Sequence, residues 1–334
     1  MVQEIIQINE SKGTPKYKQL IAAIIESIQE QRLQKGDKLG SINDFCRAFG
    51  YSRDTVMLAF NDLKSRGILV SQPGKGVYVS DDNIQVERRI FVLFDELNSF
   101  KEDLYNSFVT SMGPETKVDI FFHHFNRDLF EQLISGSAGN YTSYIIMPAM
   151  FGDIEDVLAV LPENKVYLLD RYYPNLSNYS SLYQDFESDV YDSLVEHKDA
   201  LEKYSKLVML FPGGKEPEGR LKGFRDFCDK CGYDHEIIRS LDSREITKGE
   251  VYLIPSDRNL VAIVKSANDH ELQLGEDLGV ISFNDTVLKE VVAGGITTIS
   301  TDFKLMGERL AEVVKNQEFI RERNPSGMTL RASL

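Results

Sequence analysis

Short apolar runs separated by helix-length segments fill the sequence from residue 88 to residue 334. Each run is four or five residues long, which is the length expected of a strand buried on both faces. Strands of this kind that alternate with helices form parallel βαβ units. The runs cover residues 90–94, 118–122, 144–147, 166–169, 207–211, 251–254 and 280–283.

The size of this part of the chain predicts two lobes. About 245 residues exceed what a single sheet and its helices usually hold, so we expect an α/β body of two doubly wound lobes. In such folds ligands bind beyond the carboxyl ends of the strands and between the lobes.

Polar side chains closely follow several of the apolar runs. Each one alone is readily explained as a helix N-cap or a turn residue. Their recurrence favours a site for a polyhydroxylated ligand, because carboxylates accept hydrogen bonds from hydroxyl groups and arginines donate to them. These candidate effector-binding residues are Asp95, Glu96, Asp170, Arg171, Asp257, Asn284 and Asp285.

The composition is that of a folded protein with an acidic excess. The 334 residues include 38 Lys+Arg and 52 Asp+Glu, a formal net charge of -14, and 42% hydrophobic residues provide for packed cores. No apolar run reaches the roughly 18–20 residues of a membrane span. Glu4 and Glu10 stand where a signal peptide would be basic and then apolar. We therefore expect a cytoplasmic protein that does not enter a membrane.

The charge is distributed unevenly along the chain. Residues 1–80 hold 11 Lys+Arg and 8 Asp+Glu, which gives 11 - 8 = +3, whereas the remainder gives 27 - 44 = -17. This asymmetry suggests a small domain that approaches an anionic partner, attached to an acidic body with another task. We expect a domain over residues 1–80, a linker over 81–88 and the body over 89–334.

Three helices and a hairpin are predicted in the first eighty residues. Thr14 and Pro15 suit the N-cap and the N1 position of a helix over about residues 16–31. Ser41 opens a second helix and Ser52 caps a third, which Gly67 closes. Two β-type runs then flank a glycine-rich tip, as in a hairpin. The order of these elements is typical of a winged helix-turn-helix.

The third helix would place its N-terminal residues in the major groove of DNA. The planar fork of Arg53 matches a guanine edge or a phosphate, and the hydroxyls of Ser52 and Thr55 suit phosphate oxygens. The alternative is that Ser52 is only a cap and Arg53 only a solvated residue. The complete helix, turn and wing arrangement favours DNA binding. The hairpin tip, with Lys75, would approach the minor groove.

Residues 15–79 resemble the GntR-type DNA-binding domain. The matching residues are Pro15-Lys16-Tyr17, Gly36-Asp37, Gly50-Tyr51-Ser52-Arg53 with Thr55-Val56, Leu63 with Gly67, and Gly74 with Gly76. The sequence departs from the family at Asn43, where Arg is usual, and at Met57, where a basic residue is usual, which predicts weaker phosphate binding or an unusual operator. The resemblance implies that these residues bind DNA: Lys16, Tyr17, Ser41, Asn43, Ser52, Arg53, Thr55, Gly74, Lys75 and Gly76.

Residues 88–334 resemble the LacI/GalR-type sensor, which is related to periplasmic sugar-binding proteins. The resemblance implies that Arg220 reaches the effector, and that Asn284 replaces the first residue of a usual Asp-Asp pair. The matching stretches are 168–171, 220–224, 278–285, 296–299, 306–307 and 330–333.

A chain that combines these two regions resembles the arabinose-repressor type of chimera. They imply a homodimeric regulator that binds double-stranded operator DNA, and we expect it to be a repressor. The implied effector is a monosaccharide or sugar phosphate, for which arabinose and fucose are guesses. Two alternatives stay open: a sugar-binding protein with no DNA role, and a GntR-linked enzyme of the pyridoxal-phosphate aminotransferase type.

The remaining chemistry-bearing residues do not form a recognisable catalytic or metal site. Cys228 and Cys231 form a single CxxC near the end of a helix, with no second pair nearby, and His123 and His124 would point to opposite faces. The glycine-rich stretch 211–215 lacks the spacing of a phosphate loop. We expect no catalytic residues, no cofactor and no metal, and we expect that the protein is not an enzyme. The three cysteines, which include Cys46, suit a reducing compartment.

Overall fold

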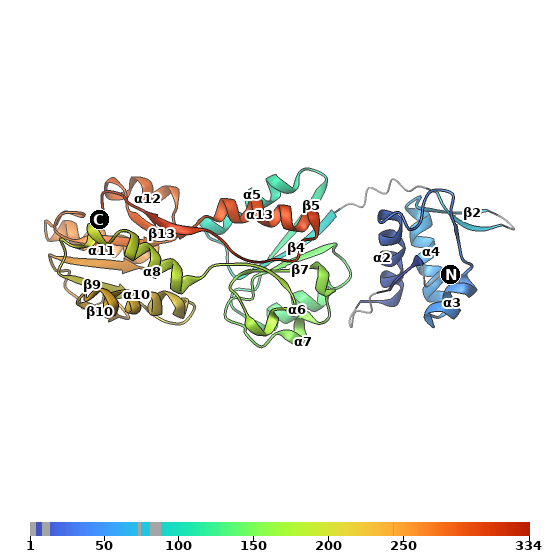
Figure 1. Ribbon diagram of the computed structural model, residues 1–334, viewed down its shortest axis with the longest axis horizontal. Coiled ribbons are helices and arrows are strands. Elements are labelled where there is room, and N and C mark those ends of the chain that lie inside the picture. The colour runs from blue at the N-terminus through green and yellow to red at the C-terminus, as the bar shows by residue number, and fades with distance from the viewer. Residues whose placement is uncertain (1–4, 9–13, 73–74, 81–87, 243) are drawn as a thin grey trace. The chain divides into compact units, whose positions relative to one another are not determined.

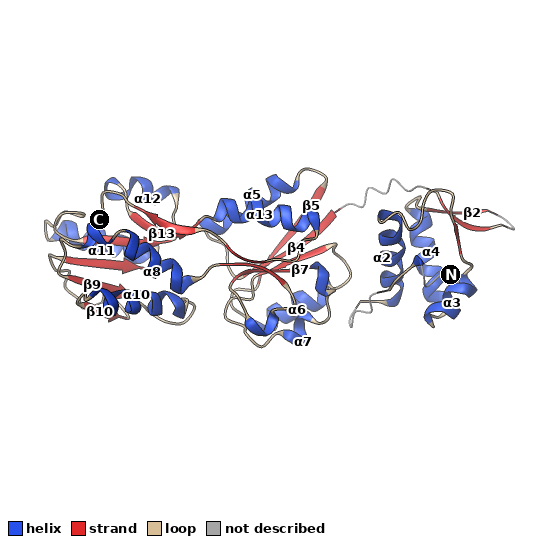
Figure 2. Cartoon of the chain, in the orientation of Figure 1, coloured by secondary structure: helices blue, strands red, loops and turns tan. Residues whose placement is uncertain are grey.

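The computed structural model describes residues 5–8, 14–72, 75–80, 88–242 and 244–334. Gly74 and residues 81–87 of the expected linker lie outside the described residues. The described chain is a mixed α/β fold with one three-stranded and two six-stranded sheets (Figures 1 and 2). Its compact units are Met1–Phe94 with Pro114–Ile146 and Phe151–Val166, and Asp95–Gly113 with Met147–Met150 and Tyr167–Leu334.

The first domain is a winged helix-turn-helix, as the sequence predicts. Its helices pack around a core that includes Phe45, Phe60 and Leu63, which are all buried. Strand β1 pairs with the hairpin, which gives the sheet order β1-β3-β2. The sequence did not predict β1, because a strand of two residues is too short to show a hydrophobic pattern. The elements are α2 (Lys16–Gln29), β1 (Lys38–Leu39), α3 (Ile42–Phe49), α4 (Arg53–Ser65), β2 (Leu69–Gln72) and β3 (Gly76–Val79).

The helix starts follow the expected capping chemistry at two of three places. Ser41 and Asp44 form a capping box at α3, and Ser52 accepts a hydrogen bond from the Thr55 amide at α4. The prediction for α2 is wrong: Pro15 is the N-cap rather than N1, and no side chain caps the helix. Pro15 has a ψ of 137°, which is not helical, so the proline lies outside the helical turns. The helix also ends at Gln29, not at residue 31.

The first large sheet has the order β14-β8-β7-β6-β4-β5. Strand β4 pairs in parallel with β5 and with β6, and β7 pairs in parallel with β8. The strands are β4 (Arg88–Phe94), β5 (Thr116–Phe122), β6 (Ser143–Ile146), β7 (Val166–Asp170), β8 (Ser180–Tyr183) and β14 (Arg321–Arg323). The helices are α5 (Ser99–Met112), α6 (Arg127–Ser137), α7 (Glu155–Leu158) and α13 (Phe303–Asn316).

The second large sheet has the order β10-β9-β11-β12-β13-β15, and its last strand is antiparallel. Its core holds Phe224, Phe227, Val251 and Ile281, all buried. The strands are β9 (Lys206–Leu210), β10 (His235–Ile238), β11 (Glu250–Ile254), β12 (Gly279–Phe283), β13 (Thr297–Thr301) and β15 (Ser326–Thr329). The helices are α8 (Phe186–Glu196), α9 (Lys198–Leu201), α10 (Glu218–Cys231), α11 (Asp257–Asp269) and α12 (Val287–Val291).

Two glycines allow close helix packing beside these sheets (Figure 1). A Cβ at Gly223 of α10 would lie 2.2 Å from the Glu187 carbonyl oxygen of α8, and one at Gly307 of α13 would lie 2.4 Å from the Leu104 carbonyl oxygen of α5. Both glycines belong to stretches that carry the family resemblance. Glycine is required at these two positions because two backbones approach each other closely there, and not because of its conformational freedom.

All seven apolar runs are strands, so the expected two-lobed α/β fold is confirmed. Several strands were not predicted by an apolar run. They lie mostly at sheet edges or carry charged and polar residues, such as Arg321–Arg323 in β14. Hydrophobic pattern is a weak signal for strands of this kind. Within the described part of the chain, no helix has the length and hydrophobicity to span a membrane.

Candidate functional site

The N-terminus of α4 presents the predicted DNA-reading residues. Val56, Ala59, Phe60 and Leu63 form its buried face, which leaves Arg53 exposed. The Ser52 and Thr55 hydroxyls lie 2.8 Å apart, so each restrains the other.

Neighbouring residues hold or flank Arg53. Its Nη1 donates to Asn43 Oδ1 at 3.2 Å, which joins the first turns of α3 and α4. Met57, one turn further along α4, has 37% of its surface exposed, and an apolar side chain on this face suits a thymine methyl group.

The other predicted DNA contacts lie at the start of α2 and in the wing. Lys16 is exposed, with its Nζ 5.0 Å from the centre of the Tyr51 ring, and Tyr17 packs partly against the core. Lys75 and Gly76 are exposed at the wing, and the Lys75 carbonyl accepts from the Tyr78 hydroxyl at 3.2 Å. The DNA-binding roles of these residues stay predictions.

The strand end of β4 carries two acids that are already paired. Asp95 is buried and forms an ion pair with the buried Lys101, and its Oδ1 also accepts from the Glu96 amide at 2.6 Å. Lys215 Nζ forms an ion pair with Glu96 Oε1 at 2.6 Å. Lys215 lies in the loop after β9, so this pair joins segments far apart in the sequence.

The strand end of β7 carries an acid and an arginine. Gln184 Nε2 donates to Asp170 Oδ1 at 2.6 Å, while Arg171 Nε lies 3.7 Å from Asp170 Oδ2. Arg171 Nη2 donates to the Lys215 carbonyl at 3.3 Å, and the guanidinium carbon lies 5.6 Å from the centre of the Phe186 ring. Asp170 has a φ of 79°, a left-handed backbone that turns the chain sharply out of the strand.

Arg220 is a buried cation that contacts two aromatic rings. It is 8% exposed, and its guanidinium lies 4.4 Å from the centre of the Phe283 ring and 5.5 Å from that of Phe186. It donates to Glu216 Oε2 and to Asn284 Oδ1, both at 3.3 Å. Burial lowers the pKa of Arg220 and raises the pKa of the Glu216 carboxyl.

These contacts connect most of the predicted effector residues. We call the set the strand-end cluster: Glu96, Asp170, Arg171, Phe186, Lys215, Glu216, Arg220 and Asn284. Asp95 adjoins it through Glu96. The arrangement can donate and accept hydrogen bonds at the carboxyl ends of the strands, where ligands of α/β folds bind.

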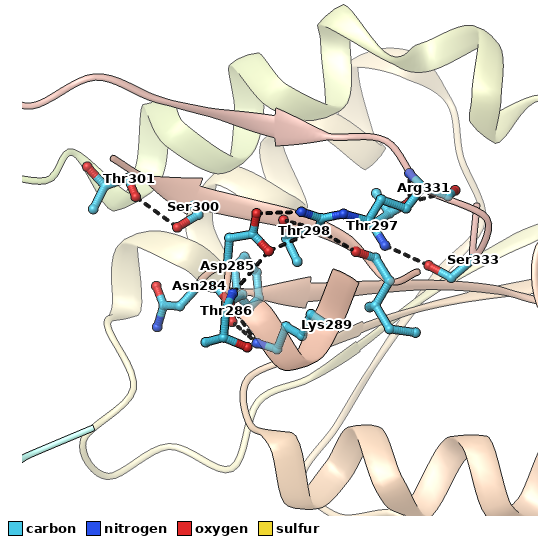
Figure 3. A network of polar contacts seen from close by, with 12 residues as sticks. Asn284, Asp285, Thr286, Lys289, Thr297, Thr298, Ser300, Thr301, Arg331 and Ser333 are labelled. Atoms are coloured by element: carbon cyan, nitrogen blue, oxygen red, sulfur yellow. Dashed lines mark hydrogen bonds and ion pairs between the residues drawn. The ribbon is translucent and has the colours of Figure 1, made fainter. Parts of the chain in front are cut away.

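Two predicted residues are engaged elsewhere. Asp285 accepts two hydrogen bonds from Arg331, at 2.9 and 2.8 Å (Figure 3). Asp257 pairs with Lys289 at 3.2 Å. Lys289 is buried and also donates to the carbonyls of Phe283 and Asn284, at 2.8 and 2.6 Å. The structure therefore places Asp257 and Asp285 in ion pairs that hold the loop after β12, and their effector-binding roles stay predictions.

Sequence reasoning missed several members of the site. Phe186 gave no signal, because one aromatic residue at a helix start resembles any core residue. Lys215 lies in the glycine-rich stretch 211–215, whose spacing does not fit a phosphate loop and therefore does not predict a binding site. Lys289 looks like a surface residue in sequence. The cluster members that the sequence did not indicate are Phe186, Lys215 and Glu216, and the unforeseen partners of the predicted residues are Lys101, Gln184, Lys289 and Arg331.

The other candidates have structural surroundings. His123 is buried against the rings of Phe130 and Phe151, and His124 is exposed. Burial raises the pKa of the Cys228 thiol to about 12. Among the described residues, no three His, Cys, Asp or Glu side chains gather closely enough to hold a metal ion.

Comparisons with known sequences define the class of protein. Residues 16–79 match the model of the family described as bacterial regulatory proteins, gntR family, and residues 202–330 match the periplasmic binding protein-like domain. The chain therefore joins a region that matches the GntR family of bacterial regulatory proteins to a region that matches a periplasmic binding protein-like domain.

Individual relatives resemble one part of the chain or the other. The transcriptional repressor YtrA of Bacillus subtilis is 27% identical over 103 residues, which is 30% of this chain and 79% of YtrA. Most of the curated relatives are matched over less than half of their own length.

Solved structures show the fold of the body. The trehalose repressor from Escherichia coli is 15% identical, with a TM-score of 0.61, over 73% of this chain and 100% of that structure. The lac repressor dimer bound to operator and the anti-inducer ONPF is 17% identical, with a TM-score of 0.59, over 73% of this chain and 93% of that one.

Proposed function

We propose that the protein is a ligand-controlled transcription regulator. Its winged helix binds operator DNA, and its LacI-type body binds a small carbohydrate effector. The observation that carries the proposal is that one chain contains both an exposed Arg53 at the start of α4 and the strand-end cluster. The domain bounds 1–80, 81–88 and 89–334 belong to the same proposal, and the GntR match at residues 16–79 supports the first of them.

DNA binding in this proposal requires a homodimer. One winged helix carries few phosphate-binding cations, since residues 1–80 have a net charge of 11 - 8 = +3. Two copies double the phosphate contacts and read two half-sites of a palindrome. The acidic remainder, at 27 - 44 = -17, repels DNA and confines contact to the readers. We propose repression as the outcome, supported by the repressor role in the name of the relative YtrA.

The effector acts at the strand-end cluster. Arg220 and Asn284 lie where the carboxyl ends of parallel strands meet, and Phe186 offers a flat apolar surface beside two guanidinium groups. An effector changes DNA affinity only by the difference between its affinities for the two states of the protein, typically 1–3 kcal/mol.

The test of this function is operator selection followed by titration. The purified full-length protein should enrich a palindromic sequence from a random DNA pool, and fluorescence anisotropy then measures its affinity. Arg53→Ala should weaken operator binding at least about tenfold, because a good base contact is worth roughly 1–3 kcal/mol.

Arg66→Ala is the matched control. Arg66 caps the other end of the same helix and pairs with Asp62 at 2.7 Å, so its loss leaves the reading face intact. Failure to enrich any sequence, or equal affinity of Arg53→Ala and the wild type, contradicts the proposed function.

A further inference from the structure

Two guanidinium groups lie against the same aromatic ring in the strand-end cluster. Arg171 and Arg220 have their guanidinium carbons 5.6 and 5.5 Å from the centre of the Phe186 ring. Burial lowers the pKa of Arg220 and the positive charge of Arg171 lowers it further, so the two guanidinium groups repel each other. The arrangement is favourable when an anion binds both groups, because a guanidinium fork matches the oxygens of a phosphate or a carboxylate.

The donors of Arg171 are poorly satisfied within the protein. Its Nε is buried and, among the described residues, has no hydrogen-bond partner; Asp170 Oδ2, at 3.7 Å, is too distant to accept from it. Its Nη2 donates to the Lys215 carbonyl at 3.3 Å. A buried donor without a partner is unfavourable, so this nitrogen marks a place for an incoming acceptor.

Each carboxylate of the cluster, in contrast, already has a donor at one of its oxygens. Gln184 donates to Asp170 at 2.6 Å, Lys215 to Glu96 at 2.6 Å and Arg220 to Glu216 at 3.3 Å. A neutral sugar brings hydroxyl groups that need both donors and acceptors. The buried Arg171 Nε has no such partner among the described residues, so a ligand gains most at this place by bringing an acceptor oxygen.

The charge at the end of β12 is consistent with this preference. Arg220 donates to the neutral amide of Asn284, and among the described residues the carboxylate that forms an ion pair with it is Glu216. The Lys215–Glu96 pair is largely open to solvent, with 51% and 33% of the two side chains exposed. Exposed pairs of this kind are weak, so Lys215 can exchange Glu96 for a ligand oxygen.

We propose that the effector is a monosaccharide that carries an anionic group, and that Arg171 and Arg220 bind this group together. The inference rests on the proposed function, because it names the ligand class of the same site. The anionic group is a phosphate or a carboxylate, and either offers the acceptor oxygen that Arg171 Nε lacks among the described residues.

The test is thermal unfolding of the full-length protein with matched ligands at equal concentration. The panel pairs glucose, ribose and arabinose with their terminal phosphates and aldonic acids, and inorganic phosphate is tested alone. At least one phosphate or acid should raise the unfolding midpoint while its parent sugar does not, and inorganic phosphate should act less. The phosphate and acid arms show which anionic group is bound.

Titration calorimetry with the stabilising compound then tests the two arginines. Arg171→Gln should weaken its binding about tenfold or more, the loss expected for a charge-assisted contact. Arg225→Gln, an exposed arginine on α10 outside the cluster, should leave binding unchanged. Asn284→Asp should also weaken binding, because it places a carboxylate beside Arg220.

Three results overturn the inference. They are a parent sugar that stabilises as strongly as its anionic form, no stabilisation by any anionic sugar, and inorganic phosphate acting as strongly as the sugar phosphates. In the first case the proposed function stands with a neutral effector. The proposed function itself fails only if operator selection fails, so the two outcomes can be told apart.

Discussion

Arg53 Nη1 donates a hydrogen bond to Asn43 Oδ1 across 3.2 Å, which links the first residue of α4 to the first turn of α3. Both residues are exposed, so the bond restrains a side chain that would otherwise move freely. Asn43 is thus placed to orient Arg53, and the sequence departs from the GntR pattern at this position.

Asn43→Ala should reduce the discrimination between operator and unrelated DNA. The variant keeps the Arg53 charge but removes its acceptor, so operator affinity should fall several-fold while affinity for unrelated DNA changes little. Anisotropy titrations with the selected operator and a scrambled duplex measure both. Equal losses on the two duplexes would show that Asn43 binds DNA directly and does not orient Arg53.

Met57→Lys should make binding stronger but less selective. Met57 is exposed on the helix that we expect in the major groove, and a lysine there adds a contact to phosphate. Each added phosphate contact steepens the dependence of log Kd on log salt by about 0.9 for each copy of the reader. The measurement is a salt series on operator and scrambled DNA; an unchanged slope would place Met57 away from the DNA.

Lys289→Met should destabilise the body. Lys289 is 2% exposed and donates to the carbonyls of Phe283 and Asn284. Met conserves the volume but cannot donate, so we expect a loss of roughly 1–3 kcal/mol in the free energy of unfolding. Urea denaturation measures it, with the exposed Lys304→Met as control. A variant as stable as the wild type would show that the carbonyls find other donors.

Asp189 should make stability fall as pH rises from about 4 to about 6. Burial raises its pKa to about 6, although Arg323 Nη2 donates to its Oδ1 at 2.7 Å. Between its ordinary value of 3.8 and about 6, the folded protein binds the proton more tightly than the unfolded chain. Stability from this group is therefore present below that window and is lost across it, on the order of 3 kcal/mol.

The Asp189→Asn variant isolates this effect. The difference in unfolding free energy between wild type and variant should decrease from pH 4 to pH 6.5 and stay level above it. A constant difference across this range would mean that Arg323 compensates the burial of the carboxylate fully.

The sequence predicted the fold well where burial produces a pattern. Buried strands such as β4 and β12 consist mainly of apolar residues, and the buried stripe of α4 repeats at helical spacing. Edge strands such as β10 and β14 keep polar residues because one side faces solvent or a loop, so they gave no such signal. The error at Pro15 arose because a proline fits both the N-cap and the N1 position.

The candidate site was predicted only in part, since sequence indicates which residues follow strands but not which of them meet. Arg220 and Asn284 lie 64 positions apart and join through one hydrogen bond. Asp257 and Asp285 look the same in sequence, yet each is held by a neighbouring cation. Lys289 and Arg331 decide that difference, and their partners are set by tertiary packing alone.

Operator affinity with and without the effector tests the central claim most directly. The full-length protein is titrated with its selected operator by anisotropy, first alone and then with a saturating amount of the compound that stabilises it. A coupled regulator should change Kd at least about fivefold, the lower end of typical allosteric coupling. The same Kd in both titrations, with the compound shown to be bound, would contradict ligand control of DNA binding.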